Sequence, residues 1–264
     1  MRNSSSKTVG TALYATYATA GALLGAAVFF GSGANAQETA SSTMDQKEFG
    51  ERVRAYLLEN PEVIMEAVAI LESREQEVQA QADVDLVAAY SDEIYNDGFS
   101  WVGGNPDGDV TVVEFLDYRC GYCRKAHPEV TELVESDGNI RLIIKELPVL
   151  GEASVLAARF AIATNIVAGD EAYGKLHEAL MTLSGNPSQP VMSRLSSTLG
   201  LDADAIVAEM NSDEVTARLQ KTRETAQKLQ INGTPGFVLA GQMMRGYAPL
   251  DVMRGFVEEA RAAQ

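Results

Sequence analysis

The spacing of hydrophobic residues predicts two helices near the N-terminal end of the chain. The first covers about residues 45–60 and has four residues on one apolar face: Phe49, Val53, Tyr56 and Leu57. Asn60-Pro61-Glu62 then combines an N-cap residue, a proline at the first helical position and an acid in the first turn, which predicts a new helix. Its apolar seam is heptad-like: Ile64, Val68, Leu71 and Val78.

The remaining pattern predicts an α/β fold with a large helical insertion. A short helix is expected at 86–97, a turn at 103–108 and a buried strand at 109–118. A helix follows from Cys120, with a kink expected at Pro128, and a second strand covers 139–147. Residues from about 152 to 230 lack a β pattern and predict helices only. Strands at 236–241 and 243–247 and a helix at 249–262 complete the domain.

The first 36 residues predict a signal peptide. Arg2 and Lys7 precede the apolar run 18–30, and Ala34-Asn35-Ala36 is a small-residue cleavage site. The run is short for a membrane span, although an uncleaved anchor is the alternative interpretation. We therefore expect cleavage after Ala36, a linker and helical extension at 37–85, and the main domain at 86–264.

The two N-terminal helices carry apolar stripes too narrow to fold alone. They must pack on the main domain as core helices or on other chains. The second alternative predicts a homo-oligomer formed through residues 45–82.

Charge and cysteine content narrow the function. The chain has 37 acidic against 21 basic side chains, which argues against binding the phosphate backbone of nucleic acids. Its two cysteines, Cys120 and Cys123, would close a loop too small for a disulfide to add much stability. A C-x-x-C motif where a strand meets a helix is typical of redox chemistry, because the helix N-terminus favours a thiolate at Cys120. Four nearby side chains add positive charge: Arg119, Arg124, Lys125 and His127.

Two segments resemble the DsbA-like branch of the thioredoxin superfamily: EFLDYRCGYC at 114–123 and INGTPGFVLAG at 231–241. The resemblance implies a thioredoxin fold with an inserted all-helical subdomain. It also implies that Thr234 and a cis Pro235 lie against the cysteines and pair with substrate. Glu114 stands where relatives carry a buried acid that helps to move the proton of the second cysteine, and Tyr122 is expected to line the substrate groove.

The resemblance further implies thiol–disulfide exchange in the periplasm, without a cofactor beyond the cysteine pair. Cys120 would attack the substrate and Cys123 would resolve the mixed disulfide. The substrates would be unfolded or misoxidised exported proteins, and a membrane redox partner would reset the pair.

The direction of exchange is less closely defined. LLENPEVIMEAV, residues 57–68, resembles the extension of the suppressor-of-copper-sensitivity C (ScsC) group. The Gly-Tyr dipeptide between the cysteines resembles periplasmic isomerases more than the Pro-His of strong oxidases, which favours an isomerase or reductase. The alternatives are a dithiol oxidase, a copper-binding protein that uses the two thiolates, and a chaperone module. No zinc site is predicted, because only His127 and His177 could complete one, and His127 is expected to be solvated or packed against a helix rather than to act as a base.

Overall fold

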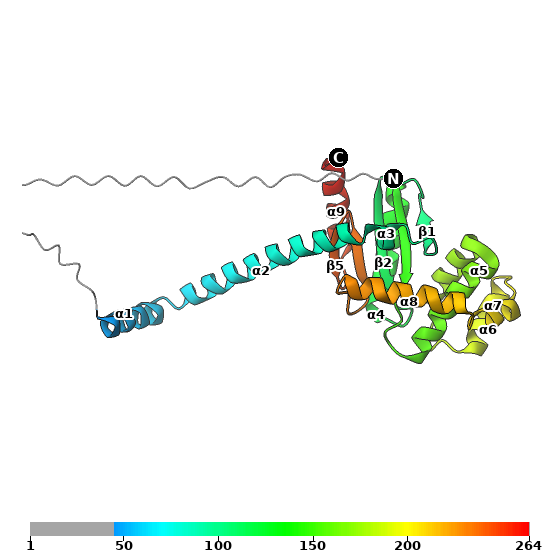
Figure 1. Cartoon of the computed structure of the whole chain (residues 1–264), viewed down its shortest axis with the longest axis horizontal. Coiled ribbons are helices and arrows are strands. Elements are labelled where there is room, and N and C mark those ends of the chain that lie inside the picture. Colours follow the sequence, from blue (N-terminus) through cyan, green and yellow to red (C-terminus); the bar gives the residue numbers. More distant parts are fainter. Residues whose placement is uncertain (1–44, 264) are drawn as a thin grey trace, which may run out of the picture. The chain divides into compact units, whose positions relative to one another are not determined.

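The computed structural model describes residues 45–263; the predicted signal peptide and its cleavage site lie outside this range. The helices and strands of this part are shown in Figure 1: α1 (Gln46–Glu59), α2 (Glu62–Ala89), α3 (Ser91–Tyr95), β1 (Trp101–Gly104), β2 (Val110–Leu116), α4 (Gly121–Asp137), β3 (Ile140–Glu146), α5 (Glu152–Met181), α6 (Gln189–Thr198), α7 (Ala203–Glu209), α8 (Asp213–Lys228), β4 (Gly236–Leu239), β5 (Gln242–Arg245) and α9 (Leu250–Ala262). The chain divides after Glu59 into two units, and α1 belongs to the first. No described helix combines the length and the apolar character needed to cross a bilayer.

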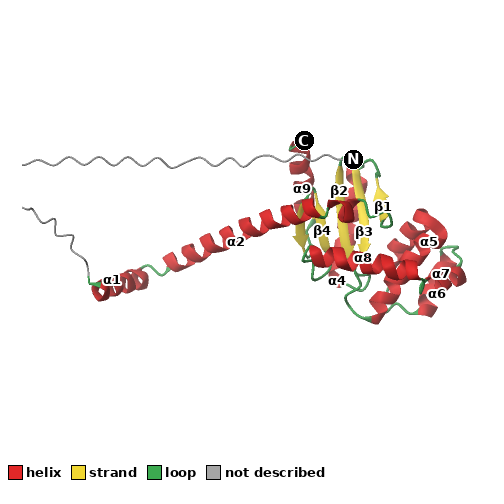
Figure 2. Ribbon diagram, in the orientation of Figure 1, coloured by secondary structure: helices red, strands yellow, loops and turns green. Residues whose placement is uncertain are grey.

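A mixed sheet with the strand order β1-β3-β2-β4-β5 forms the centre of the second unit (Figure 2). β2 and β3 run parallel, from the pair Val110 and Ile140 to the pair Leu116 and Glu146, and α4 makes the crossover between them. The other neighbouring strands are antiparallel. The predicted α/β architecture is therefore confirmed, and four of the five strands lie where the hydrophobic pattern indicated them.

The edge strand β1 was missed. Its last two residues, Gly103 and Gly104, fall in the segment predicted as a turn. Glycine is a weak strand former, and only the antiparallel pairing of these residues with Leu142 and Arg141 makes them a strand. Gly104 has φ +64°, and a Cβ atom there would lie 2.4 Å from the carbonyl oxygen of Ile140, so a larger residue would not fit.

Alternation along the strands divides the core between the two faces of the sheet. Val112 and Leu116 face the cluster that contains residues of α4, α5 and α9. Val113 and Phe115 face the other cluster, with residues of α2, α3 and α8. Helix α8 lies across the strands in Figure 2. Glu114 lies two residues from both Val112 and Leu116, so its side chain shares their face of the sheet and points toward α4.

Helices α5 to α8 form the predicted all-helical insertion. α5 changes direction at Gly169, which has φ +82° and extended ψ. Asp202 and Ser212 cap α7 and α8 with side-chain oxygens that accept backbone N–H groups. The later half of α8 returns to the sheet and buries Thr225 and Ala226. α4 continues from Gly121 to Asp137 with Pro128 inside it. The kink expected at this proline stays a prediction.

The two N-terminal helices are separated at Pro61, where the break was predicted. α1 ends at Glu59 and α2 begins at Glu62, directly after Pro61. The seam of α2 is exposed: Ile64, Val68, Leu71 and Val78 have 40–71% of their surface accessible. The alternative in which these residues belong to the core of the same chain is therefore wrong.

Helix α2 continues through residue 85, where a boundary was predicted, and ends on the main domain. The separate helix predicted for 86–97 is in fact the last turn of α2 followed by α3. Val87 is buried in the sheet cluster, and the Arg245 guanidinium binds the Asp83 carboxylate through two contacts of 2.5 and 2.9 Å. Burial raises the pKa of Asp83, but the hydrogen bonds from Arg245 and Gln79 and the charge of Arg245 outweigh it and hold the pKa below its usual range.

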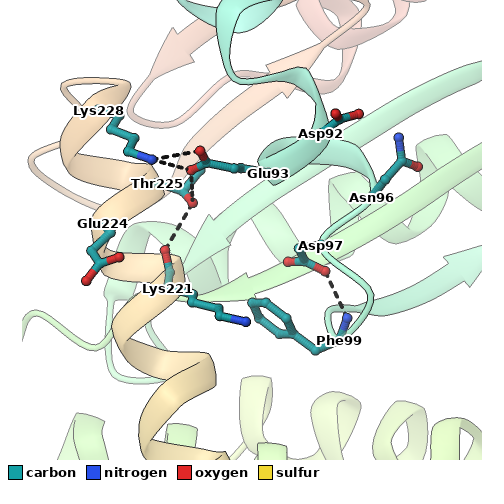
Figure 3. Close-up of a pocket in the computed structure, with 9 residues that line it drawn as sticks. All are labelled: Asp92, Glu93, Asn96, Asp97, Phe99, Lys221, Glu224, Thr225 and Lys228. Atoms are coloured by element: carbon teal, nitrogen blue, oxygen red, sulfur yellow. Dashed lines mark hydrogen bonds and ion pairs between the residues drawn. The ribbon is translucent and has the colours of Figure 1, made fainter. Parts of the chain in front are cut away.

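Helix α3 is held against α8 by charged groups around a cavity of about 390 Å³ (Figure 3). Lys228 Nζ lies 2.7 and 2.8 Å from the two oxygens of Glu93. Asp97 accepts a 2.5 Å hydrogen bond from the buried Lys145 Nζ. In each pair the lysine ammonium and the carboxylate neutralise one another. The cavity lies on the α8 face of the sheet, away from the cysteines.

Candidate active site

The two cysteines lie at the start of α4. Cys120 is the N-cap residue, with extended backbone dihedrals, and its N–H donates to the Asp117 carbonyl at 2.9 Å. Cys123 lies in the first helical turn. Cys120 keeps 8% of its surface exposed whereas Cys123 keeps none, and both are free thiols in this structure. Cys120 therefore keeps some exposed surface, whereas Cys123 is fully enclosed.

A loop from a distant part of the chain contacts the more exposed sulfur. The Thr234–Pro235 peptide bond is cis, as expected. The Cys120 thiol donates to the Thr234 carbonyl at 3.1 Å. The loop is fixed to β5 by the Gly246 N–H, which donates to the Pro235 carbonyl at 2.9 Å. Thr234 and Pro235 therefore lie where the resemblance placed them, against Cys120.

The surface next to Cys120 is open. Tyr122 is 64% exposed. A Cβ atom on Gly121 would meet no other atom within 4 Å. The dipeptide between the cysteines thus leaves room for a polypeptide to approach.

A buried carboxyl group lies on the sheet below α4. Glu114 is 1% exposed, and its Oε1 has no hydrogen-bond partner among residues 45–263. Burial raises the pKa of Glu114 to about 8, so the neutral form predominates at pH 7. Burial also raises the pKa of the Cys123 thiol, and the negative charges of Glu114 and Cys120 act in the same direction. The expected buried acid is therefore present, and in its ionised form it raises the pKa of the Cys123 thiol.

Asp117 shapes the loop before Cys120 and was not singled out from the sequence. Its Oδ1 accepts the Arg119 N–H at 2.8 Å. Its Oδ2 accepts the N–H groups of Val149 and Leu150 at 2.9 and 3.0 Å. An Asp whose carboxylate accepts the N–H two residues later is a local turn signal, but the partners of Asp117 that lie 32 and 33 residues later appear only in the fold.

The positive side chains near the motif are engaged away from the sulfurs. Arg119 donates to the Leu150 carbonyl, and Arg124 donates to the carbonyls of Tyr118 and Leu183. The Lys125 ammonium lies 3.8 Å from the centre of the Tyr247 ring. Any effect of these charges on Cys120 therefore acts through space rather than through direct hydrogen bonds.

A buried polar network adjoins the active-site loop and was also missed. The Tyr118 hydroxyl lies 3.2 Å from both the Tyr173 hydroxyl and His177 Nδ1. Tyr173 donates to the Glu146 carboxylate. Burial raises the pKa of Glu146 to about 7, although the Tyr173 hydrogen bond opposes this shift. Burial lowers the pKa of His177 to about 3, so His177 is neutral near pH 7.

One group of side chains has the spacing of a metal site. The ligand atoms of His127, His177 and Glu178 lie within 4.8 Å of one another. His127 is buried and pairs with Glu178 at 2.8 Å, so it packs between helices rather than facing solvent. Neither cysteine belongs to this group.

A C-x-x-C motif at the start of a helix, facing a cis-proline loop beside a mixed sheet, defines the thioredoxin-like class of proteins. Residues 111–258 match the family model of the DSBA-like thioredoxin domain, and the chain belongs to this family. Residues 45–77 match the model of the copper resistance protein ScsC N-terminal domain. The similarity to the ScsC group therefore extends to the exposed helices.

Two solved structures illustrate the relationship. A thioredoxin-like oxidoreductase from Silicibacter pomeroyi is 42% identical, with a TM-score of 0.62; the match covers 66% of this chain and 98% of the other. ScsC from Proteus mirabilis, in a transitional conformation, is 27% identical with a TM-score of 0.63, and the match covers 83% and 97%.

The first curated relatives are longer proteins. The Na(+)/H(+) antiporter NhaA 3 of Salinispora tropica is 26% identical over 162 residues, which are 61% of this chain and 25% of the antiporter. The chain thus spans about a quarter of the length of this relative.

Proposed function

We propose that this protein catalyses thiol–disulfide exchange on exported proteins. The observation that carries the proposal is the 3.1 Å contact between the Cys120 sulfur and the Thr234 carbonyl, which joins the C-x-x-C motif to the cis-proline loop. Cys120 is the attacking residue because it retains exposed surface, whereas Cys123 is enclosed.

The reaction proceeds through a mixed disulfide. The Cys120 thiolate attacks one sulfur of a client disulfide, a new S–S bond forms, and the other client sulfur leaves as a thiolate that takes up a proton. Cys123 then gives up its proton and attacks the Cys120 sulfur. The client leaves with both sulfurs reduced, and Cys120 and Cys123 are oxidised to a disulfide. The same steps in reverse oxidise a client.

Glu114 serves as the proton acceptor for Cys123. A pKa near 8 leaves a fraction of Glu114 ionised at pH 7, so the group can both receive and return a proton. Its unpaired Oε1 is not committed to another donor. Water is excluded from the Cys123 thiol by burial, which makes an internal acceptor necessary.

Thr234, Pro235 and Tyr122 form the client-binding surface next to Cys120. The exposed Tyr122 ring offers an apolar contact, and the Thr234–Pro235 loop offers backbone groups beside the sulfur. An extended client segment fits such a surface because its own backbone groups need partners.

The proposed direction is isomerisation or reduction, with oxidation as the alternative. The open Gly-Tyr dipeptide and the exposed N-terminal seam support the first, because an isomerase must hold misfolded clients. Cys120→Ser is expected to abolish insulin reduction and the repair of scrambled ribonuclease, and unchanged rates in this variant would refute the proposal. The redox state of the pair in cells, measured by alkylation, distinguishes the directions: mostly dithiol supports an isomerase, mostly disulfide an oxidase.

We assign this activity to the periplasm, with a membrane redox partner that resets the cysteine pair and with residues 1–36 removed as a signal peptide. The exposed apolar residues of α2 support self-association through residues 45–82. Light scattering on the chain with and without residues 38–82 tests this part, and the same number of subunits for both would rule out an oligomer formed through these helices.

Copper binding is a second candidate function, supported by the match of residues 45–77 to the copper resistance protein ScsC N-terminal domain. The two thiols would be soft ligands for Cu(I). Copper that stays bound through gel filtration in the presence of competing thiols would support it. A chaperone role would instead leave aggregation suppression intact when both cysteines are replaced.

A further inference from the structure

A groove of about 550 Å³ begins at the loop that follows β3 and runs along α8. It is lined by five apolar side chains: Leu147, Pro148, Val149, Val155 and Leu219. Two arginines, Arg159 and Arg223, also line it. The combination is an apolar floor with positive charge beside it.

This groove is joined to the active-site loop. Val149 and Leu150 donate their N–H groups to Asp117, and Leu147 N–H donates to the Leu116 carbonyl at 2.7 Å. Asp117 in turn accepts the Cys120 N–H. Both hydrogen bonds to Asp117 are 2.9 Å long, so the backbone nitrogens of Val149 and Cys120 are at most about 10 Å apart. Roughly three or four residues of extended chain span this distance.

The charge beside the groove is unlike that of the rest of the chain, whose net charge is −16. Neither Arg159 nor Arg223 forms an ion pair with a carboxylate of residues 45–263. The Arg159 guanidinium is held in place by the Met210 carbonyl and the Thr216 hydroxyl, at 2.9 and 3.2 Å. Arg223 is exposed. Both cations are therefore available to an acidic group of a bound molecule.

We propose that the groove binds the segment of a client polypeptide that flanks its reacting cysteine. An apolar side chain of the client packs on Val149 and Leu219, and an acidic side chain next to it pairs with Arg223. The proposal rests on the proposed exchange function and adds a preference for clients with apolar and acidic residues three or four positions from the cysteine.

Binding without exchange tests the groove directly. The probe is a fluorescent peptide with serine in place of the cysteine and with Leu and Glu three and four residues to each side; a second peptide has Lys in place of Glu. Fluorescence anisotropy is expected to show tighter binding of the Glu peptide to the full chain. Arg223→Glu should weaken it about tenfold and favour the Lys peptide, as expected for loss and reversal of one charge pair.

Two further variants make the test specific. Val149→Ser changes an exposed part of the floor and should weaken both peptides. Arg194→Glu, an exposed arginine on α6 outside the groove, should leave the preference between the peptides as in the unmodified chain. Equal affinity for both peptides, or the same effect from Arg194→Glu and Arg223→Glu, would overturn the proposal.

Exchange rates distinguish failure of the groove assignment from failure of the exchange function. With the cysteine restored and joined to glutathione in a mixed disulfide, attack by Cys120 releases glutathione or the peptide as a thiol, and kcat/KM should favour the Glu peptide in the unmodified chain and the Lys peptide in Arg223→Glu. If both peptides react at equal rates in all variants, the groove assignment fails and the exchange function stands. If neither peptide nor insulin is reduced while the anisotropy preference persists, the exchange function fails and the groove remains a peptide site.

Discussion

Replacing Glu114 by Gln removes a titrating group from the core while preserving its shape. The carboxyl group lies on β2 below α4, is 1% exposed and has an unpaired Oε1. Because burial raises its pKa from the usual value of 4.5 to about 8, the native state keeps a proton that the unfolded chain releases over this interval. The stabilising effect of the neutral acid is thus complete below about pH 4.5 and is lost as pH rises toward 8.

The size of this loss follows from proton linkage. Each pH unit between the two pKa values removes about 1.4 kcal/mol from the free energy of unfolding. Between pH 5 and pH 7 the unmodified chain should lose about 2.5 kcal/mol through this residue alone. Glu114→Gln does not titrate, so its free energy of unfolding relative to the unmodified chain should rise by that amount over the same range. The buried amide adds an offset of about 1–3 kcal/mol, which is independent of pH.

Urea unfolding of the reduced proteins, followed by far-ultraviolet circular dichroism at several pH values, measures this difference. Glu135→Gln, which changes an exposed carboxylate on α4, is the control and should show a difference that does not vary with pH. If Glu114→Gln and the unmodified chain lose stability in parallel between pH 5 and 7, Glu114 is not a buried neutral acid. Its proposed role as proton acceptor for Cys123 would fall with it.

Two further substitutions test contacts that hold the site and the N-terminal helix. Tyr173→Phe removes the donor to Glu146, and we expect the free energy of unfolding to fall by about 2–3 kcal/mol. Tyr122→Phe, at an exposed ring, is the control and should change the free energy of unfolding by less than about 0.5 kcal/mol. Equal effects of the two substitutions would show that the buried network does not stabilise the fold. Asp83→Asn weakens the contact with Arg245, so amide hydrogens in residues 83–89 should exchange about tenfold faster, a loss of roughly 1.4 kcal/mol in local opening. Asp85→Asn is the matched control on the same helix, and unchanged protection in Asp83→Asn would show that the ion pair does not hold the end of α2.

Only some residues of the candidate site could be predicted from the sequence. Cys120, Cys123, Thr234 and Pro235 could be selected because short motifs carry their chemistry. Glu146 and Tyr173 could not, since their partners lie 27 and 55 residues away and nothing local marks them. Asp117 has a local turn signal, but its partners Val149 and Leu150 lie 32 and 33 residues away. His177 was considered only as a zinc ligand, because its contact with Tyr118 spans 59 residues. Burial gives Glu146 and His177 their shifted pKa values, and burial is a property of the folded core.

The fold shows the same division. β2 and β3 were predicted because buried central strands need continuous runs of apolar residues. β1 was missed because four residues ending in two glycines have little strand preference, and pairing with β3 determines their conformation. The boundary expected near residue 85 does not interrupt α2, because Arg245 and the sheet cluster hold its last turns on the domain.

Sequence by itself determined the order of the elements, the break at Pro61 and the position of the cysteines at the start of a helix, because these depend on neighbours along the chain. Tertiary structure decided that Thr234 meets Cys120 across 114 residues, that Glu114 stays neutral and that the seam of α2 is left uncovered. Those properties depend on which distant groups exclude water from a side chain, and only the packed molecule specifies that.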